Sequence, residues 1–224
     1  MDFLIYYGLA FVSIIITLGA QIYVSSSYSR YSKVPSSRGI TGAQAARYML
    51  DSNGLRNVSV VPVAGTLTDH YDPKTKQVRL SQKNFTEASV AAVAVACHEC
   101  GHAMQDQEQY AFMRFRSALV PVTRISTYVG YIAILIGCLV FEPLIYVGII
   151  AEVVILLFQL VTLPVETDAS RRALQQIEGS NLLVEGEVKS GKVVLRAAAM
   201  TYVASVITSL IQVLRLLAIF RRRD

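Results

Sequence analysis

The sequence predicts a mainly α-helical fold, in which four transmembrane helices carry a small α+β domain built from the loops between spans one and two and between spans three and four. The chain has 224 residues, of which 53% are hydrophobic and only 17% are charged, and its mean hydropathy is +0.44. Soluble domains usually contain about 25% charged residues. This composition excludes a disordered chain, a basic nucleic-acid-binding domain and an ordinary soluble enzyme.

Four runs of the chain are long and apolar enough to cross a bilayer, which takes roughly 17–25 residues. They hold only two of the 37 charged residues, Glu152 and Arg215, while the other 35 are spread over the remaining 143 residues at the density of a soluble protein. The second run is extended backwards to Leu119. The runs are residues 4–24, 125–141, 144–163 and 198–220.

These runs divide the chain into seven segments. Residues 1–24 are expected to form a retained anchor rather than a cleaved signal peptide, because no basic segment precedes the apolar run and no clear small-residue cleavage site follows it. The other expected segments are a soluble part at 25–118, spans at 119–141 and 144–163, a soluble segment at 164–197, a span at 198–220 and a basic tail at 221–224.

Within the loops, local signals predict a few short elements. Residues 25–40 are Ser-rich and are expected to form a linker. Thr41 is expected to cap a helix over 42–52, and Asn84 one over 85–109. Residues 58–63 are expected to form a strand, and Pro62 makes it an edge strand. Residues 67–71 and 77–80 are expected to form a hairpin around the turn that begins at Asp72-Pro73. After span three, a helix is expected over 165–178, followed by a second helix that continues into span four.

Basic residues near the spans predict the orientation, because they mark the cytoplasmic side. Ten of them flank the spans in the two large loops, and Arg221–Arg223 lie at the C-terminus. The balance predicts cytoplasmic loops with both termini outside, although the three terminal arginines favour the opposite. The three cysteines indicate no disulfide framework; Cys97 and Cys100 are interpreted as buried thiols, with a redox or metal CxxC role as the alternative.

One motif carries chemistry: His98-Glu99-Cys100-Gly101-His102, an HExxH pattern on a predicted helix. Histidines four residues apart share one helix face, so both imidazoles can bind one zinc ion while Glu99 lies beside the open coordination position. Glu99 is then the candidate general base. The alternative is a pair of buried histidines satisfied by hydrogen bonds.

A catalytic zinc needs a third protein ligand. Two crossings separate the HExxH helix from residues 164–197, so Glu166 and Asp168 return to its side, whereas Glu142 lies a bilayer thickness away, ~30 Å. Glu152 lies about 21 Å deeper than Glu166 along a continuous helix. Glu166 is the preferred ligand, with Asp168 orienting a ligand histidine; the swapped assignment and His70 are the alternatives.

The sequence allows more than one role for three further polar residues. His70, before the hairpin turn, is interpreted as an oxyanion donor, as part of an edge strand that pairs with a peptide, or as a solvated turn histidine. Glu152 and Arg215 lie within spans, where charge is costly. A polar stripe in span four that ends at Arg215 indicates either a hydrated groove for a membrane-embedded substrate or interhelical hydrogen bonding with Arg215 reaching the interface.

Four segments of the chain resemble the bacterial neutral zinc metallopeptidases of the YugP type: residues 69–73 (DHYDP), 97–105 (CHECGHAMQ), 163–173 (LPVETDASRRA) and 197–204 (AAAMTYVA). The resemblance implies a multi-pass zinc peptidase of the bacterial cell membrane with a zincin-like domain, zinc ligands His98, His102 and Glu166, and Glu99 as the catalytic base. More distantly, the chain is similar to the membrane gluzincins, which have an acidic residue four positions after the ligand Glu. Here that position is Ser170 and the acid is Asp168.

The sequence therefore predicts a membrane-embedded metallopeptidase, with one Zn²⁺ per chain at the cytoplasmic face, that hydrolyses peptide bonds in membrane or membrane-proximal proteins. The expected partners are a peptide or membrane-protein substrate and the lipid bilayer, and no nucleic acid. The alternative is a non-enzymatic four-helix membrane protein, a transporter or scaffold on a retired protease fold. The oligomeric state is not indicated by the sequence.

Overall fold

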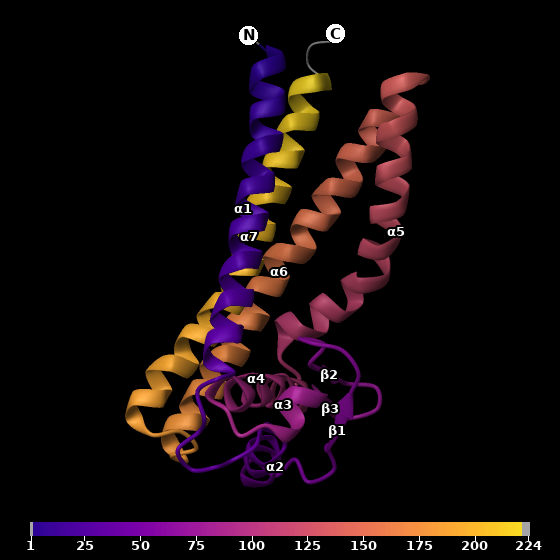
Figure 1. The fold of residues 1–224 in the computed structure, drawn as a ribbon. Coiled ribbons are helices and arrows are strands. Elements are labelled where there is room, and N and C mark those ends of the chain that lie inside the picture. Colours follow the sequence, from indigo (N-terminus) through magenta and orange to yellow (C-terminus); the bar gives the residue numbers. More distant parts are fainter. Residues whose placement is uncertain (1, 221–224) are drawn as a thin grey trace. The chain divides into compact units, whose positions relative to one another are not determined.

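The structure, a computed structural model, describes the backbone of residues 2–220 and the side chains of residues 7–218. It confirms a mainly helical fold with four long apolar helices and a small sheet (Figure 1). In chain order the elements are α1 (Asp2–Tyr31), α2 (Gly42–Ser52), β1 (Ser59–Val63), β2 (His70–Asp72), β3 (Gln77–Ser81), α3 (Gln82–Thr86), α4 (Val90–Gln107), α5 (Ala111–Leu139), α6 (Leu144–Gly179) and α7 (Glu185–Phe220).

The described residues fall into two compact units. One, here called the apolar unit, contains residues up to 21, 112–164 and 201–220. The other, the loop unit, contains Ile22–Ala111 and Val165–Met200, and so joins the two segments between the spans into one body. All the residues of the HExxH motif, together with Glu166 and Asp168, belong to the loop unit.

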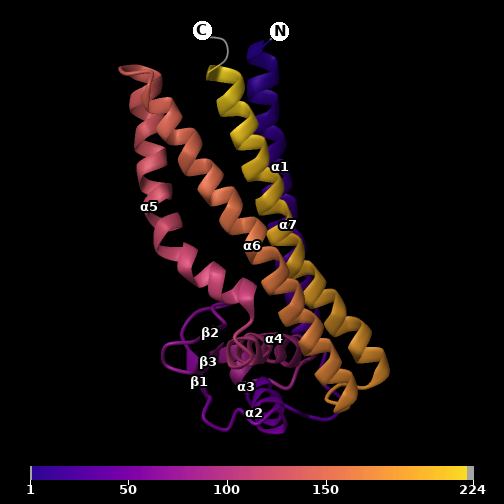
Figure 2. The same cartoon turned by 180° about the vertical axis from the view of Figure 1, so that it is seen from behind.

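In the loop unit, α4 is the central buried helix. Its residues from Val90 to Ala94 are inaccessible to solvent, and it packs on α2, α3 and the sheet (Figure 2). The sheet has the order β1-β3-β2, with β1 parallel and β2 antiparallel to β3. The predicted edge strand with Pro62 and the predicted hairpin are therefore both present, as is the helix capped by Thr41.

The predicted cap of the HExxH helix is wrong. The expected helix over 85–109 is divided into α3 and α4, and Ser89 caps α4 by accepting a hydrogen bond from the Ala92 N–H. Asn84 is instead buried, where its amide donates to Asp69 and its oxygen accepts from the Tyr28 hydroxyl. Tertiary hydrogen bonds, which a local motif cannot reveal, determine the place of this side chain.

Two helices are longer than the apolar runs that predict them. The linker predicted over 25–40 is wrong at its start, because α1 continues to Tyr31, with Ser26 and Ser32 bonding backbone carbonyls within the helix. Span three and the helix predicted over 165–178 are one unbroken helix, α6, in which Pro164 is an internal residue. Glu166 is thus held on a rigid element rather than on a loop.

In the apolar unit, α5 and α6 form the hairpin predicted around Glu142-Pro143. Glycines allow their close approach: a Cβ at Gly130 would lie 2.6 Å from the Ala151 Cβ, and one at Gly137 would lie 2.9 Å from the Ile145 backbone nitrogen. Small residues at such contacts are the usual means by which membrane helices associate.

Candidate metal centre

Three potential metal ligands converge in the loop unit. His98 and His102, one turn apart on α4, direct their Nε2 atoms at Glu166 Oε2 on α6, at 3.2 and 3.4 Å. One donor atom from each residue lies within 4.8 Å of the others, and the three side chains are 14%, 11% and 4% exposed. Two imidazole nitrogens and a carboxylate oxygen are the donor set of a catalytic zinc site.

Gly101, within the HExxH motif, lets α6 come this close. A Cβ on it would lie 2.6 Å from the Ala169 carbonyl oxygen and 3.1 Å from the Ala169 Cα. On α6, fully buried residues recur every four positions from Val165 through Ala169 and Ala173 to Ile177. This apolar face packs α6 into the loop unit, and the Gly101–Ala169 contact places Glu166, three residues earlier, against both histidines.

The other ring nitrogen of each histidine is also held. His98 Nδ1 is hydrogen-bonded to Ser170 Oγ at 3.1 Å, and His102 Nδ1 to Gln105 Oε1 at 3.0 Å. The Gln105 amide nitrogen donates to the Val165 carbonyl and to Asp168 Oδ2, so its oxygen must face the ring. The His102 Nδ1 must then carry a proton, so Nε2 is the ring nitrogen that can coordinate a metal.

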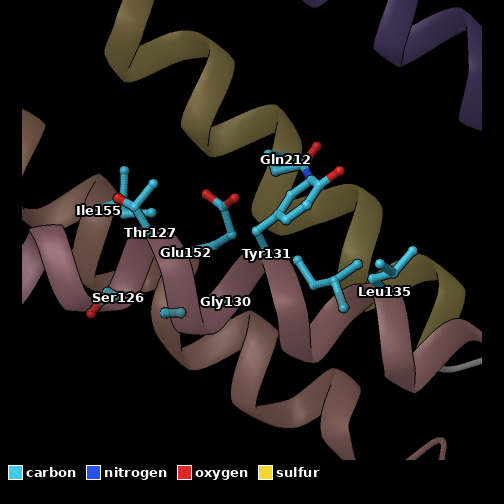
Figure 3. A pocket seen from close by; sticks show the side chains of 10 residues that line it. Ser126, Thr127, Gly130, Tyr131, Leu135, Glu152, Ile155 and Gln212 are labelled. Carbon is cyan, nitrogen blue, oxygen red and sulfur yellow. The ribbon is translucent and has the colours of Figure 1, made fainter.

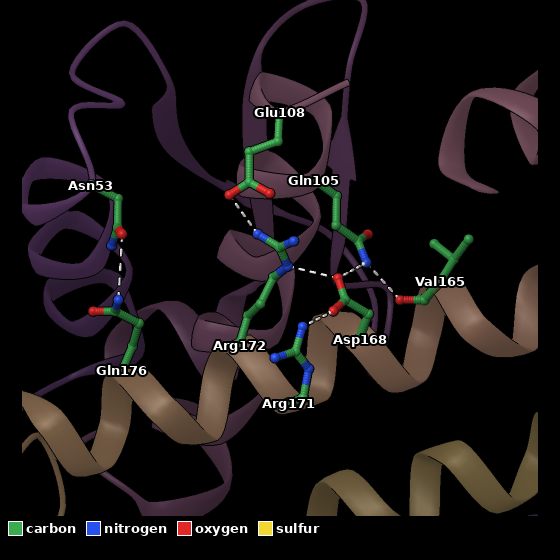
Figure 4. A network of polar contacts seen from close by, with 8 residues as sticks. All are labelled: Asn53, Gln105, Glu108, Val165, Asp168, Arg171, Arg172 and Gln176. Atoms are coloured by element: carbon green, nitrogen blue, oxygen red, sulfur yellow. Dashed lines mark hydrogen bonds and ion pairs between the residues drawn. The ribbon is translucent and has the colours of Figure 1, made fainter. Parts of the chain in front are cut away.

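Asp168 supports this arrangement indirectly. Its carboxylate accepts hydrogen bonds from Gln105, Arg171 and Arg172, and Arg172 also binds Glu108 at the end of α4 at 2.7 Å (Figure 4). Gln105 thus stands between Asp168 and His102. Asp168 is predicted to orient a ligand histidine. In the structure its link to His102 runs through Gln105, and Gln105 and Ser170 are the residues that contact the two histidine rings.

The electrostatics of the cluster favour a cation. Burial lowers the pKa of His102, but the hydrogen bond and charge of Glu166 outweigh burial and raise it to about 9. Glu99, on the same helix and 8% exposed, has its pKa raised by burial, which the two histidines partly offset. The negative charges of Glu166 and Glu99 favour a positive charge at His102, and a bound Zn²⁺ would supply such a charge. The donor atoms and the electrostatics of the cluster therefore both fit the ion.

His70 lies on β2, exposed to solvent, with Nδ1 bonded to the Thr68 carbonyl at 2.8 Å. It is not part of the three-donor cluster. Its neighbour Asp69 accepts hydrogen bonds from Asn84 and Ser81 and contributes to the field at Glu99. Of the three predicted candidates for third ligand, the structure brings only Glu166 to the histidines.

Glu152 and Arg215 lie in the apolar unit. Glu152 lines a cavity of about 310 Å³, together with Tyr131 of α5 and Gln212 of α7 (Figure 3). Arg215 donates to Gln212 Oε1 at 2.8 Å, and the hydroxyls of Ser205 and Thr208 bond carbonyls of their own helix. The polar stripe of span four therefore satisfies much of its hydrogen bonding within α7.

Sequence reasoning missed three residues of this centre: Gly101, Gln105 and Ser170. Gln105 lies three positions after His102 and Ser170 four after Glu166, spacings that share a helix face. Those spacings could have indicated both as supporting residues. No local signal could have indicated that Gly101 contacts Ala169, because the contact joins helices distant in sequence.

Comparisons with known proteins agree with this geometry. The family described as "Putative neutral zinc metallopeptidase" matches residues 6–221 of the chain. The chain is also similar to the "Putative membrane protease YugP" of Bacillus subtilis (strain 168), with 46% identity over 202 residues that cover 90% of each protein. No solved structure matches the chain.

Proposed function

Because this chain belongs to the neutral zinc metallopeptidase family that it matches over nearly its whole length, we propose that it hydrolyses peptide bonds with a zinc ion held by His98, His102 and Glu166. The observation that carries this proposal is the convergence of the three donor atoms, two from an HExxH helix and one from α6, within 4.8 Å. It goes beyond the family match, because it names the three residues that hold the metal.

Each residue has a distinct task in the proposed mechanism. His98 and His102 would hold the zinc through Nε2, while hydrogen bonds from Nδ1 to Ser170 and Gln105 fix the orientation of the two rings. Zinc, when bound, supplies a Lewis acid that lowers the pKa of a coordinated water to about 7. Glu99 accepts the proton of the attacking water on a carboxylate oxygen and then delivers it to the nitrogen of the leaving amine.

The environment of Glu99 suits a general base. Burial raises the pKa of Glu99 above its ordinary value, which makes its carboxylate a stronger base than an exposed glutamate. We propose that the substrates are membrane or membrane-proximal proteins, because the four apolar helices anchor the site to a bilayer and the similar Bacillus subtilis protein is described as a membrane protease.

Substitution of Glu99 tests the reaction. Glu99→Gln keeps the shape of the side chain but removes the base, so the purified full-length variant should retain about one zinc per chain while cleavage of labelled casein falls roughly 10²–10⁴-fold. The matched control is Glu87→Gln, the same change at an exposed glutamate of the loop unit. Equal cleavage by wild type and Glu99→Gln would refute the assignment.

We further propose that the loop unit faces the cytoplasm and both termini lie outside, as the ten basic residues of the loops favour. A cysteine added after Asp224 should then react with a membrane-impermeant maleimide in intact cells. Labelling only after permeabilisation would indicate the opposite orientation. That result would leave the assignment of the metal ligands unchanged.

A further inference from the structure

A basic groove lies beside the metal centre in the loop unit. It has a volume of about 400 Å³ and lies between the part of α6 that follows span three and the part of α7 that precedes span four. Its lining includes Ser170, whose hydroxyl bonds His98. The lining residues that set its charge are Arg171, Glu178, Lys192 and Arg196.

The groove lies where both helices leave their apolar runs. Thr167, at one side, follows the end of the run 144–163 by four residues, and Ala199, at the other, is the second residue of the run 198–220. Because α7 is unbroken, Arg196 lies only about 3 Å along the helix axis from the first residue of that run. This is the level at which lipid headgroups meet a membrane helix.

The charge of the groove is positive and available for binding. Lys192 and Arg196 are exposed, and neither has an ion pair among the residues that the structure describes. Arg171 is paired with Asp168 but is still 60% exposed. Glu178, the one acidic residue in the lining, lies two helical turns beyond Arg171, about 10 Å further along α6.

We propose that this groove binds the headgroup of an anionic phospholipid. Guanidinium groups match the oxygens of a phosphate with two parallel hydrogen bonds, and basic pockets between membrane helices are favourable sites for anionic headgroups. The acyl chains would continue along the apolar runs, whose beginning at Ala199 already lines the groove. An acidic peptide matches the charge but not the position of the groove at the ends of two apolar runs.

Native mass spectrometry of the full-length protein in detergent tests this proposal, with phosphatidylglycerol and phosphatidylcholine as the two probes. The protein should retain phosphatidylglycerol at lower lipid concentrations. The double variant Lys192→Gln/Arg196→Gln should lose that preference by roughly 30-fold, since each basic residue near a membrane surface contributes about a fivefold gain. Lys189→Gln, a neighbouring exposed residue of α7 outside the groove, is the matched control and should keep it.

Three results would overturn the proposal: equal retention of the two lipids, an unchanged preference in the double variant, or loss of the preference in Lys189→Gln. Displacement by hexaglutamate would instead indicate an acidic peptide, and displacement by millimolar inorganic phosphate a site for the free anion. Both substituted side chains are exposed, so the unfolding temperature should not change. Glu99→Gln should bind lipid like wild type, which keeps this test separate from that of the peptidase.

Discussion

Replacing Gly101 with alanine tests how α4 and α6 keep the distance that the metal centre needs. The new Cβ would lie 2.6 Å from the Ala169 carbonyl oxygen and 3.1 Å from its Cα. Both are backbone atoms of a fully buried residue, so no side-chain rotation can relieve the contact. Ordinary contact begins near 3.4 Å, so the helices must separate by roughly 0.8 Å.

This displacement is large on the scale of a zinc site, where ligand distances lie within about 0.2 Å of 2.1 Å. Glu166 moves with α6, so we expect zinc affinity to fall about 100-fold. This is the upper end of the loss seen when residues that position a metal ligand are changed. Overpacking costs about 1–3 kcal/mol of unfolding free energy, while the better helix propensity of alanine returns up to about 1 kcal/mol. The metal-free variant should therefore remain folded.

Zinc affinity, measured by competition with a fluorescent chelator, and thermal unfolding of the metal-free protein separate the two effects. Gly191→Ala is the matched control, because its Cβ would meet only ordinary contacts, at 3.4 Å from Leu183 and 3.7 Å from Ala94. It should keep wild-type zinc affinity and gain stability of up to about 1 kcal/mol. Wild-type zinc affinity in Gly101→Ala would refute the reasoning.

Three other predictions follow from the same centre. Ser170→Ala should weaken zinc binding about tenfold and Ser170→Asp should restore it, because a carboxylate also accepts the His98 Nδ1 proton; equal affinities in the chelator assay would contradict this role. Cys97 and Cys100 should resist iodoacetamide at pH 8 until the protein is denatured, since burial raises the pKa of Cys97 to about 12 and leaves the thiol protonated; labelling of both in the native protein, detected by mass spectrometry, would argue against a buried helix. Chelation of zinc should lower the unfolding temperature, and added zinc should restore it; an unchanged temperature would indicate that zinc does not bind the folded state.

The convergence of His98, His102 and Glu166 was predictable because it depends on periodicity and topology alone. His98 and His102 share a helix face by their spacing, and the two apolar runs between His102 and Glu166 return the chain to the side that it left. The supporting residues depend on tertiary contacts. Gln105 and Ser170 acquire their roles only when α4 and α6 meet, and Gly101 decides how closely they meet.

The errors in local structure have a similar origin. Asn84 resembles a helix cap, yet its hydrogen bonds with Asp69 and Tyr28 are made deep in the loop unit. The serines after span one suggest a linker, but their hydroxyls bond backbone carbonyls inside α1, and Tyr28 is buried at 6% exposure. Asn and Ser side chains can both form hydrogen bonds with nearby backbone N–H and C=O groups, in helices as well as in loops. Tertiary packing rather than local preference therefore decides between helix and loop at these positions.

The zinc content of the wild-type protein, Glu166→Ala and Asp168→Ala, each purified at full length, tests the central claim most directly. Wild type should contain about one zinc per chain, since the centre provides one set of three ligands. Glu166→Ala should lose the metal, whereas Asp168→Ala should keep it with weaker affinity, because Asp168 reaches His102 only through Gln105. Full zinc occupancy in Glu166→Ala, or its loss in Asp168→Ala alone, would contradict this assignment of the metal centre.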